Sequence, residues 1–458
     1  MRLNLESLAY DLPEDILKKK WAGDFDGVKR LIVRRLERPG LTPMLRDRLT
    51  VELALIDRWV RRFPYTREEA IAAMQKRVTG FTGEEFDALE DEGCMDFIYV
   101  NGVKKYISSF GGTLIRMKND LKAREIEKDS PEEYNRLEEN IDRMTKNGSA
   151  AWRFRVKAHL KLDDESFIPG ETYMCHLPVP AACAQQSADE IRVFPQEGGV
   201  VAPEDEMQRT VVYRRTLAQN EPFEVEYSYV TRLKYCDPLN DAPGIVYPGA
   251  GEPVPDDLSE QAPHILFTPY LKNLAREIAG GETDKVRLAR RVYDYITQNV
   301  KYSFMRSYIL IDRHAEYAAL NLKGDCGIQA ILFITLCRIL GIPARWQSGR
   351  TVDRTETGCH DWAQFYTKEF GWLFADPSFG GAAWRNGNER RWNFYFGNLD
   401  PFRMIANRRY QTNFNPPKAF ERFDPYDNQD GEIECLARGF DCTEFDEGGV
   451  TLEYENIE

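Results

Sequence analysis

The chain has 458 residues, of which 42% are hydrophobic and 29% charged, and its formal net charge is −13. This length and composition are typical of a globular protein with more than one hydrophobic core, and about three domains are expected. The negative charge argues against binding to nucleic acid or to an acidic membrane surface, and no run of about 18 apolar residues predicts a membrane-spanning helix.

Cysteine and histidine usage bears on compartment and cofactors. The nine cysteines are an odd number without regular spacing, which fits a reducing compartment better than a disulfide framework. The first residues lack the charged segment and apolar stretch of a signal peptide, so we expect a cytoplasmic protein. No C-x-x-C pair occurs and the five histidines are dispersed, so we expect no metal site. Gly249–Gly251 lacks the context of a dinucleotide-binding loop, and we expect no cofactor.

Residues 1–125 are predicted to form a helical domain with a β-hairpin. Two capping boxes, beginning at Thr66 and Thr82, each open a short helix. Asn101-Gly102 is a typical hairpin turn. Helices before a hairpin weakly suggest a winged helix, but without a basic excess we favour a scaffold or protein-contact role. Residues 126–149 are predicted to be a charged helical linker.

The sequence changes character at residue 150. Apolar and polar side chains alternate from Trp152 to Lys161 and from Phe223 to Tyr229, which indicates half-buried strands. We therefore predict a β-sandwich over residues 150–236. It could steer substrate, although an inert packing module is the simpler interpretation. Residues 237–264 are rich in proline and glycine and predict a linker or a covering loop.

A cysteine opens an apolar segment further along the chain. Residues Cys326 to Leu340 are almost wholly apolar and are followed by Gly341, which predicts a buried helix with a sharp end. Asp325 is placed to cap its N-terminus. The Cys326 thiol should then lie at the free N–H groups of the first turn, where the helix dipole can lower a cysteine pKa. The backbone N–H of Cys326 is a candidate oxyanion donor.

A short hairpin is predicted to follow. His360 begins one aromatic-rich strand, the turn lies near Gly371, and Asp376 ends the second strand before a proline. The two ends of an antiparallel pair are neighbours, so a hydrogen bond between His360 and Asp376 is expected. Cys359 should point to the opposite face from His360 and take no part in the site.

These motifs, in this order, resemble the transglutaminase-like superfamily over about residues 265–400. The matching motifs are Gly-Asp-Cys-Gly at Cys326, Gly-Ile-Pro-Ala-Arg after its helix, His-x-Trp at His360, then Gly-Trp and Asp-Pro at Asp376. The resemblance implies a papain-like α+β core, with Cys326 as nucleophile, His360 as base and Asp376 as the residue that orients the base. Members of the family include cross-linking transglutaminases, peptidases and glycan-releasing amidases. The calcium sites of the eukaryotic cross-linking enzymes are not visible in this sequence, which argues against strict cross-linking.

The predicted fold class is therefore α+β and multidomain, with an N-terminal helical domain, a middle β-sandwich and a papain-like transglutaminase core. Residues 401–458 are predicted to be an extension that wraps the core and carries two late strands, near Ile433–Ala437 and Val450–Tyr454. Tyr302 and Trp346 are candidates for a second oxyanion donor, although each would more often be a core aromatic residue.

The function predicted is cysteine-dependent acyl transfer or hydrolysis at an amide bond of a protein or peptide, through a Cys-His-Asp triad and a thioester. Hydrolysis is the default outcome because water is in excess. One alternative is a catalytically silent scaffold that binds a protein or glycan partner, since a lone cysteine in an apolar helix is usually a core residue, as we expect of Cys337. A second alternative is an amidase acting on a glycan–asparagine bond. The sequence leaves the oligomeric state open.

Overall fold

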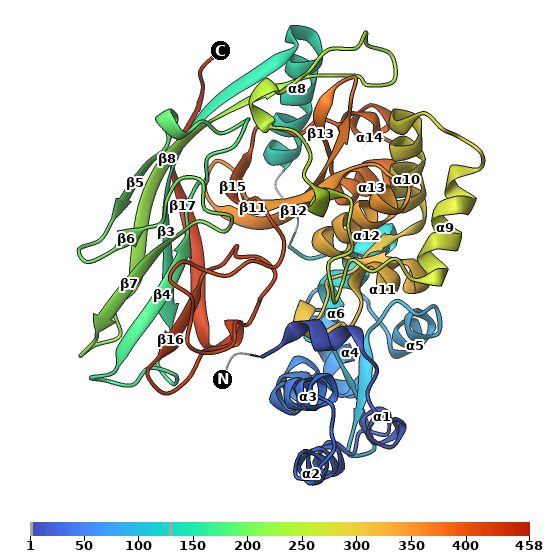
Figure 1. Ribbon diagram of the computed structural model, residues 1–458, viewed down its shortest axis with the longest axis vertical. Helices are drawn as coiled ribbons and strands as arrows, with labels where there is room; N and C mark the ends of the chain where they lie inside the picture. The colour runs from blue at the N-terminus through green and yellow to red at the C-terminus, as the bar shows by residue number, and fades with distance from the viewer. Residues whose placement is uncertain (1–2, 128–130) are drawn as a thin grey trace.

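The computed structural model describes residues 3–127 and 131–458 and has a mixed α+β architecture (Figure 1). The N-terminal helices lie at one end, two packed sheets lie along one side, and a third sheet surrounded by helices lies on the other side. None of the helices within these residues combines the length and the apolar character needed to cross a bilayer.

The N-terminal part is helical with a hairpin, as predicted. Thr66 and Glu69 form the complete capping box at the start of α4. Thr82 caps α5 as expected, but Glu85 instead pairs with Arg124. The elements are α1 (Glu14–Trp21), α2 (Phe25–Leu36), α3 (Pro43–Arg62), α4 (Arg67–Gln75), α5 (Gly83–Asp91), β1 (Phe97–Val100), β2 (Val103–Tyr106), α6 (Phe110–Met117) and α7 (Asn119–Ala123).

The helix predicted for the linker is α8 (Pro131–Asn147), and it packs on its neighbours. Ile141 and Met144 are fully buried. Asn140 accepts a hydrogen bond at 3.0 Å from the indole of Trp152, on the first strand of the sandwich. Glu138 binds Asn388, beside the core helix α14 (Glu389–Phe394), at 2.9 Å. Helix α8 therefore connects the sandwich to the core rather than lying free in solvent.

Two four-stranded antiparallel sheets form the sandwich. Their strand orders are β16-β4-β7-β6 and β17-β3-β8-β5. A contact between the sheets is the Tyr213 hydroxyl, which donates to the Glu224 carbonyl at 2.6 Å. The strands are β3 (Ser149–Leu162), β4 (Thr172–Pro178), β5 (Arg192–Pro195), β6 (Val200–Val201), β7 (Thr210–Thr216), β8 (Phe223–Lys234), β16 (Glu432–Cys435) and β17 (Phe445–Asn456).

The C-terminal strands lie where the sequence did not place them. The two late strands exist, but β16 pairs with β4 and β17 pairs with β3, so each completes a different sheet of the sandwich. The expectation that residues 401–458 simply wrap the core is therefore wrong for these strands. Strand β17 covers the length of β3, whose backbone groups would otherwise be exposed at a sheet edge.

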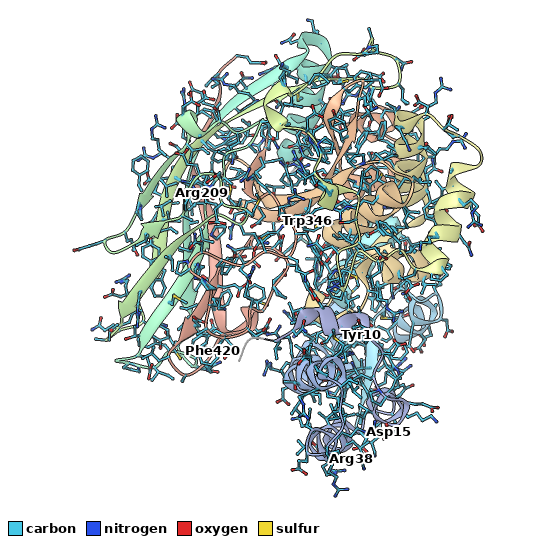
Figure 2. All side chains as sticks on the ribbon, in the orientation of Figure 1. Tyr10, Asp15, Arg38, Arg209, Trp346 and Phe420 are labelled. Carbon is cyan, nitrogen blue, oxygen red and sulfur yellow. The ribbon has the colours of Figure 1, made fainter. Side chains whose placement is uncertain are left out.

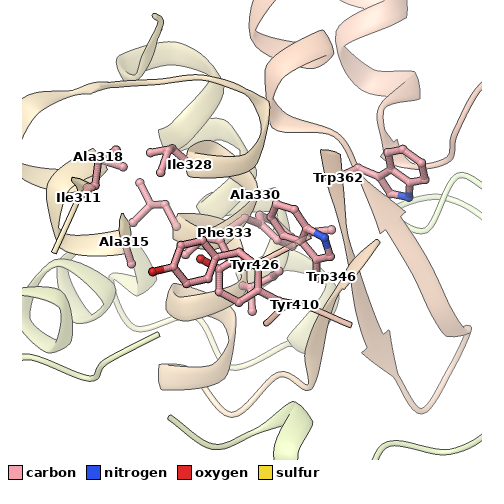
Figure 3. Packing of buried hydrophobic residues seen from close by; sticks show 14 of the residues in the cluster. Ile311, Ala315, Ala318, Ile328, Ala330, Phe333, Trp346, Trp362, Tyr410 and Tyr426 are labelled. Atoms are coloured by element: carbon pink, nitrogen blue, oxygen red, sulfur yellow. The ribbon is translucent and has the colours of Figure 1, made fainter. Parts of the chain in front are cut away.

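The core contains a five-stranded antiparallel sheet of order β14-β13-β12-β11-β15. Helix α12 packs on one face through Phe333, whose ring lies 5.9 Å from that of Phe365 on β12. Figure 3 shows Trp346 on this face, beside Phe333, with Trp362 across the sheet. The strands are β11 (Ala344–Val352), β12 (Thr357–Thr367), β13 (Gly371–Ala375), β14 (Phe396–Gly397) and β15 (Arg403–Asn407), and the helices are α9 (Pro269–Ala279), α10 (Lys285–Asn299), α11 (His314–Asn321), α12 (Cys326–Ile339), α13 (Pro377–Arg385) and α14.

The sandwich and the core are joined along β15. The Ile405 carbonyl accepts from the Ala181 N–H at 2.8 Å, and the Ala406 carbonyl accepts from the Arg209 N–H at 3.0 Å. Figure 2 places Arg209 in the sandwich layer and Trp346 in the core. Strand β15 is thus an edge strand of the core sheet whose free edge is covered by the sandwich, which fixes the two parts relative to each other.

Candidate active site

The N-terminus of α12 positions Cys326 as the sequence predicts. Helix α12 begins at Cys326, and the Asp325 side chain accepts from the Ile328 N–H at 3.1 Å. The Tyr308 hydroxyl donates to the same carboxylate at 2.5 Å. Gly327 has no side chain, and a Cβ there would lie 2.8 Å from an Asp361 oxygen. The glycine therefore allows Asp361 to approach the cysteine.

The thiol of Cys326 is bound to a carboxylate. Its Sγ donates to Oδ2 of Asp361 at 3.3 Å, and the other oxygen of Asp361 accepts from the Gln429 amide. Burial raises the pKa of Asp361 to about 7; a hydrogen bond with Asp427 opposes this, and the charge of Asp325 adds to it. Asp361 therefore changes its protonation state near neutral pH.

This environment reverses the expected effect of the helix dipole. Burial first, and then the charges of Asp361 and Asp325, hold the pKa of the Cys326 thiol well above its ordinary value. A buried thiolate beside two carboxylates is disfavoured more strongly than the first turn of a helix can favour it. The expectation of a lowered cysteine pKa does not hold for this arrangement of the site.

His360 and Asp376 form the pair that the hairpin predicts. Nε2 of His360 lies 2.8 Å from Oδ2 of Asp376, and both side chains are buried. Asp376 also meets Arg403 at 3.1 Å and accepts from the Phe379 N–H at 3.0 Å. Burial alone would raise the pKa of Asp376, but the charges of His360 and Arg403 lower it to about 2. Asp376 is therefore ionised and must accept the proton that Nε2 carries.

The imidazole of His360 is neutral at neutral pH. Burial lowers its pKa, Arg403 acts in the same direction, and Asp376 opposes them. A neutral ring that carries its proton on Nε2 has its lone pair on Nδ1. Such a nitrogen can accept a proton from a thiol.

The structure brings together two of the three predicted residues. Across the described part of the chain no hydrogen bond joins the Cys326 sulfur to His360; the sulfur instead binds Asp361. His360 and Asp361 are neighbours on a strand and point to opposite faces. Cys326 lines a hollow of about 270 Å³ and His360 lines a second of about 620 Å³. Residues that border both are Tyr302, Phe304 and Cys359.

The two candidate oxyanion donors differ in position. Tyr302 borders the hollow of Cys326, and burial and the nearby Cys326 raise its pKa. Trp346 turns the six-membered edge of its indole toward Gly327, while its Nε1 is buried and finds no hydrogen-bond partner within the described residues. The position of Tyr302 therefore fits a donor to the site, whereas the indole nitrogen of Trp346 lies at the far end of its ring.

Cys359 borders the site, contrary to the sequence-based expectation. It shares the hollow of Cys326, and its Sγ lies 2.6 Å from an Asp430 oxygen. Strand alternation places Cys359 on the face of Asp361, the residue that contacts Cys326, and Cys359 also borders the hollow of His360.

Sequence reasoning missed the carboxylates around the thiol. Asp361, Asp424 and Asp427 border the hollow of Cys326 together with Gln429. The last three lie about a hundred residues beyond Cys326 in a segment without a recognisable motif. Only the fold brings that segment over the start of α12.

One group of residues has the donor types of a metal site. Ligand atoms of Cys359, Asp430 and Glu447 lie within 4.8 Å of one another. Glu447 is already paired with the buried guanidinium of Arg350 at 2.6 Å. A cation bound there would be placed next to that positive charge, which disfavours it.

Part of this chain matches a transglutaminase-like domain. Residues 272–377 match the sequence model of the Transglutaminase-like superfamily, and this range contains Cys326, His360 and Asp376. The chain therefore carries a domain of that superfamily within a larger α+β protein. No curated protein matches this sequence significantly.

Several solved structures are similar to the chain. A protein from Cytophaga hutchinsonii, provisionally described as a cysteine protease, is 14% identical with a TM-score of 0.39; the match covers 68% of this chain and 90% of that one. The periplasmic domain of TgpA from Pseudomonas aeruginosa is 13% identical with a TM-score of 0.27, covering 56% and 96%. A protein from Parabacteroides distasonis, provisionally described as a protease, is 8% identical with a TM-score of 0.22; the match covers 50% of this chain and 59% of that one.

Proposed function

We propose that this protein is a cysteine-dependent enzyme that cleaves or transfers an acyl group at an amide bond of a protein or peptide. The observation that carries the proposal is the buried His360–Asp376 hydrogen bond of 2.8 Å. His360 lines a hollow that adjoins the hollow of Cys326, a cysteine at the first position of a capped helix. A neutral imidazole held by an ionised carboxylate is the arrangement that a nucleophilic thiol requires from its base.

The proposed reaction begins with proton transfer from the Cys326 thiol to Nδ1 of His360. The thiolate attacks the amide carbonyl, and the backbone N–H of Cys326, with the Tyr302 hydroxyl, stabilises the oxyanion. His360 then gives its proton to the leaving amine, which leaves a thioester on Cys326. Water, or an amine with access to the site, resolves the thioester. Asp376 keeps the Nε2 proton in place throughout.

The Cys326 side chain must change its partner for this reaction. In the present arrangement the sulfur is bound to Asp361, so the thiol must turn toward the hollow that contains His360. The two hollows adjoin at Tyr302, Phe304 and Cys359. Because His360 and Asp361 point to opposite faces of β12, this approach also requires a shift of β12 against the start of α12. Catalytic contacts often tighten only when substrate binds.

Trapping the acyl-enzyme tests the proposal. Peptide amides and asparagine-glycosylated peptides are incubated with the wild-type chain, with Cys326→Ala and with Cys337→Ala, and acyl adducts are located by mass spectrometry. We expect an adduct on Cys326 in the wild type and in Cys337→Ala, and its loss in Cys326→Ala. Selective acylation by the glycopeptide would instead favour the glycan–asparagine amidase. An adduct that persists in Cys326→Ala would exclude this nucleophile.

A catalytically silent scaffold is the second candidate, and one observation favours it. The thiol is bound to a carboxylate and its pKa is raised, which is the opposite of an activated nucleophile. The rate of alkylation separates the candidates. Labelling of Cys326 no faster than labelling of the buried Cys337 at any pH, with substrate analogue present, would support the scaffold.

A further inference from the structure

A third hollow, separate from those of Cys326 and His360, is lined by arginines. It has a volume of about 130 Å³ and lies where the start of β11, the middle of β12, the segment after β15 and the loop after β4 meet. Arg345, Arg408 and Arg409 border it together with the amide side chains of Gln185 and Gln364. The cysteine, histidine and aspartate of the proposed reaction do not border it.

The arginines around this hollow carry more positive charge than the neighbouring carboxylates neutralise. Arg409 pairs with Asp257 at 2.8 Å. Arg345 donates instead to neutral oxygens, those of the Gln364 side chain at 2.8 Å and the Ala250 carbonyl at 3.4 Å. Among the described residues neither Arg345 nor Arg408 has a carboxylate partner, so two positive charges remain in a chain whose net charge is −13.

Unused hydrogen-bond donors accompany this charge. Nε of Arg408 is buried without a hydrogen-bond partner among the residues described, and its guanidinium otherwise donates to the Asp205 carbonyl. The Gln364 oxygen is occupied by Arg345, which leaves its amino group as a donor. Burial lowers the pKa of Arg345 to about 10, and the charges of Arg408 and Arg409 oppose the favourable effect of Asp257. An anion would relieve this repulsion.

The size and charge of the hollow restrict its ligand. Sites for drug-sized molecules occupy about 300–1,000 Å³, so a hollow of about 130 Å³ suits a single small group. Guanidinium groups match the oxygens of phosphate in a bidentate manner. We propose that Arg345, Arg408 and Arg409 form a binding site for phosphate, either the free ion or the phosphoryl group of a small phosphomonoester.

Binding to the full chain tests the proposal. Inorganic phosphate, glycerol phosphate and chloride at the same ionic strength are titrated by calorimetry into the wild type, Arg345→Gln, Arg408→Gln and the control Arg232→Gln, an exposed arginine paired with Glu190 at 2.6 Å. We expect saturable binding of phosphate with one site per chain. Each hollow variant should weaken it about tenfold or more, because a charge-assisted hydrogen bond is lost, and Arg232→Gln should not.

The two phosphate sources are separated by the second ligand. Binding of glycerol phosphate would assign the site to a phosphoryl group on a larger molecule, and binding of inorganic phosphate alone would assign it to the free ion. No saturable binding of either beyond that of chloride, or binding that survives both hollow variants, would overturn the proposal.

A measurement on the unaltered chain covers the case in which the variants fail to fold. Phenylglyoxal modifies accessible arginines, and peptide mapping gives the rate at each position. Phosphate should slow the modification of Arg345 and Arg408 without slowing that of Arg232. Equal protection at all three positions, or protection at none, would contradict the site.

Discussion

Replacing Asp361 by asparagine tests what controls the reactivity of Cys326. The sulfur lies 3.3 Å from Oδ2 of Asp361. Two full charges at this distance repel each other by about 5 kcal/mol at an effective dielectric constant of about 20. Asp361→Asn keeps the size of the side chain, removes its charge and replaces one acceptor oxygen by an amino group. The thiolate of Cys326 should therefore form more readily in the variant.

The size of the effect depends on pH. The pKa of Asp361 is about 7, so its carboxylate is mostly ionised at about pH 8 and mostly protonated at about pH 5. Relief of slightly more than a quarter of the repulsion, about 1.4 kcal/mol, raises the thiolate fraction about tenfold. We expect iodoacetamide to label Cys326 at least about tenfold faster in Asp361→Asn than in the wild type at alkaline pH, and the ratio should shrink in acid.

The assay needs a second carboxylate of the same hollow as its control. Asp430 lines the hollow but contacts the sulfur of Cys359 rather than that of Cys326. Peptide mapping after alkylation should show no more than a small change at Cys326 in Asp430→Asn. If Asp361→Asn labels Cys326 at the wild-type rate at alkaline pH, or if the gain is the same in acid, this carboxylate does not hold back the thiol.

Three further predictions concern stability, each measured by urea unfolding. Asp376→Asn should lower the free energy of unfolding by about 3–5 kcal/mol because it breaks the buried ion pair with Arg403. The folded pKa of Asp376, about 2, lies below the ordinary 3.8, so this stabilisation is present above about pH 4 and is lost toward pH 2. A difference between variant and wild type that stays constant with pH would contradict the prediction. The folded pKa of Asp361 is raised from 3.8 to about 7, so the wild type loses stability as pH rises through this window. The free energy of unfolding of Asp361→Asn should therefore exceed that of the wild type by up to about 4 kcal/mol at the alkaline end. A difference that grows as pH falls would contradict this prediction. Gly349→Ala would place a Cβ 1.9 Å from a main-chain oxygen of β15 and should lower the free energy of unfolding by about 3 kcal/mol. The control Gly244→Ala, whose Cβ would meet open space, should change it by no more than about 0.5 kcal/mol. The same loss of stability in both variants would show that β15 moves aside at little cost.

Local patterns predicted the elements that carry the site. The apolar run from Cys326, its Asp325 cap and the glycine that follows it define α12 within about a single turn. The hairpin is equally local, and it places His360 next to Asp376. Both elements depend on hydrogen bonds and side-chain alternation among residues close in sequence, so they can be read from the chain.

Long-range contacts account for what was missed. Strands β16 and β17 complete sheets whose other strands lie more than two hundred residues earlier. Strand periodicity identifies such segments, but it does not specify a partner. The same limit applies to the site, because the segment that contains Asp424 and Asp427 has no motif that relates it to Cys326.

The amino-acid sequence by itself determined a transglutaminase-like domain, its capped cysteine helix and its histidine–aspartate hairpin, because each arises from hydrogen bonding and alternation within a short stretch. Only the tertiary structure decided the immediate partner of the sulfur, the protonation behaviour of that partner and the convergence of three arginines on one small hollow. The physical reason is that burial and Coulomb interactions depend on distances in space. Those distances are fixed by packing between segments that are far apart along the chain.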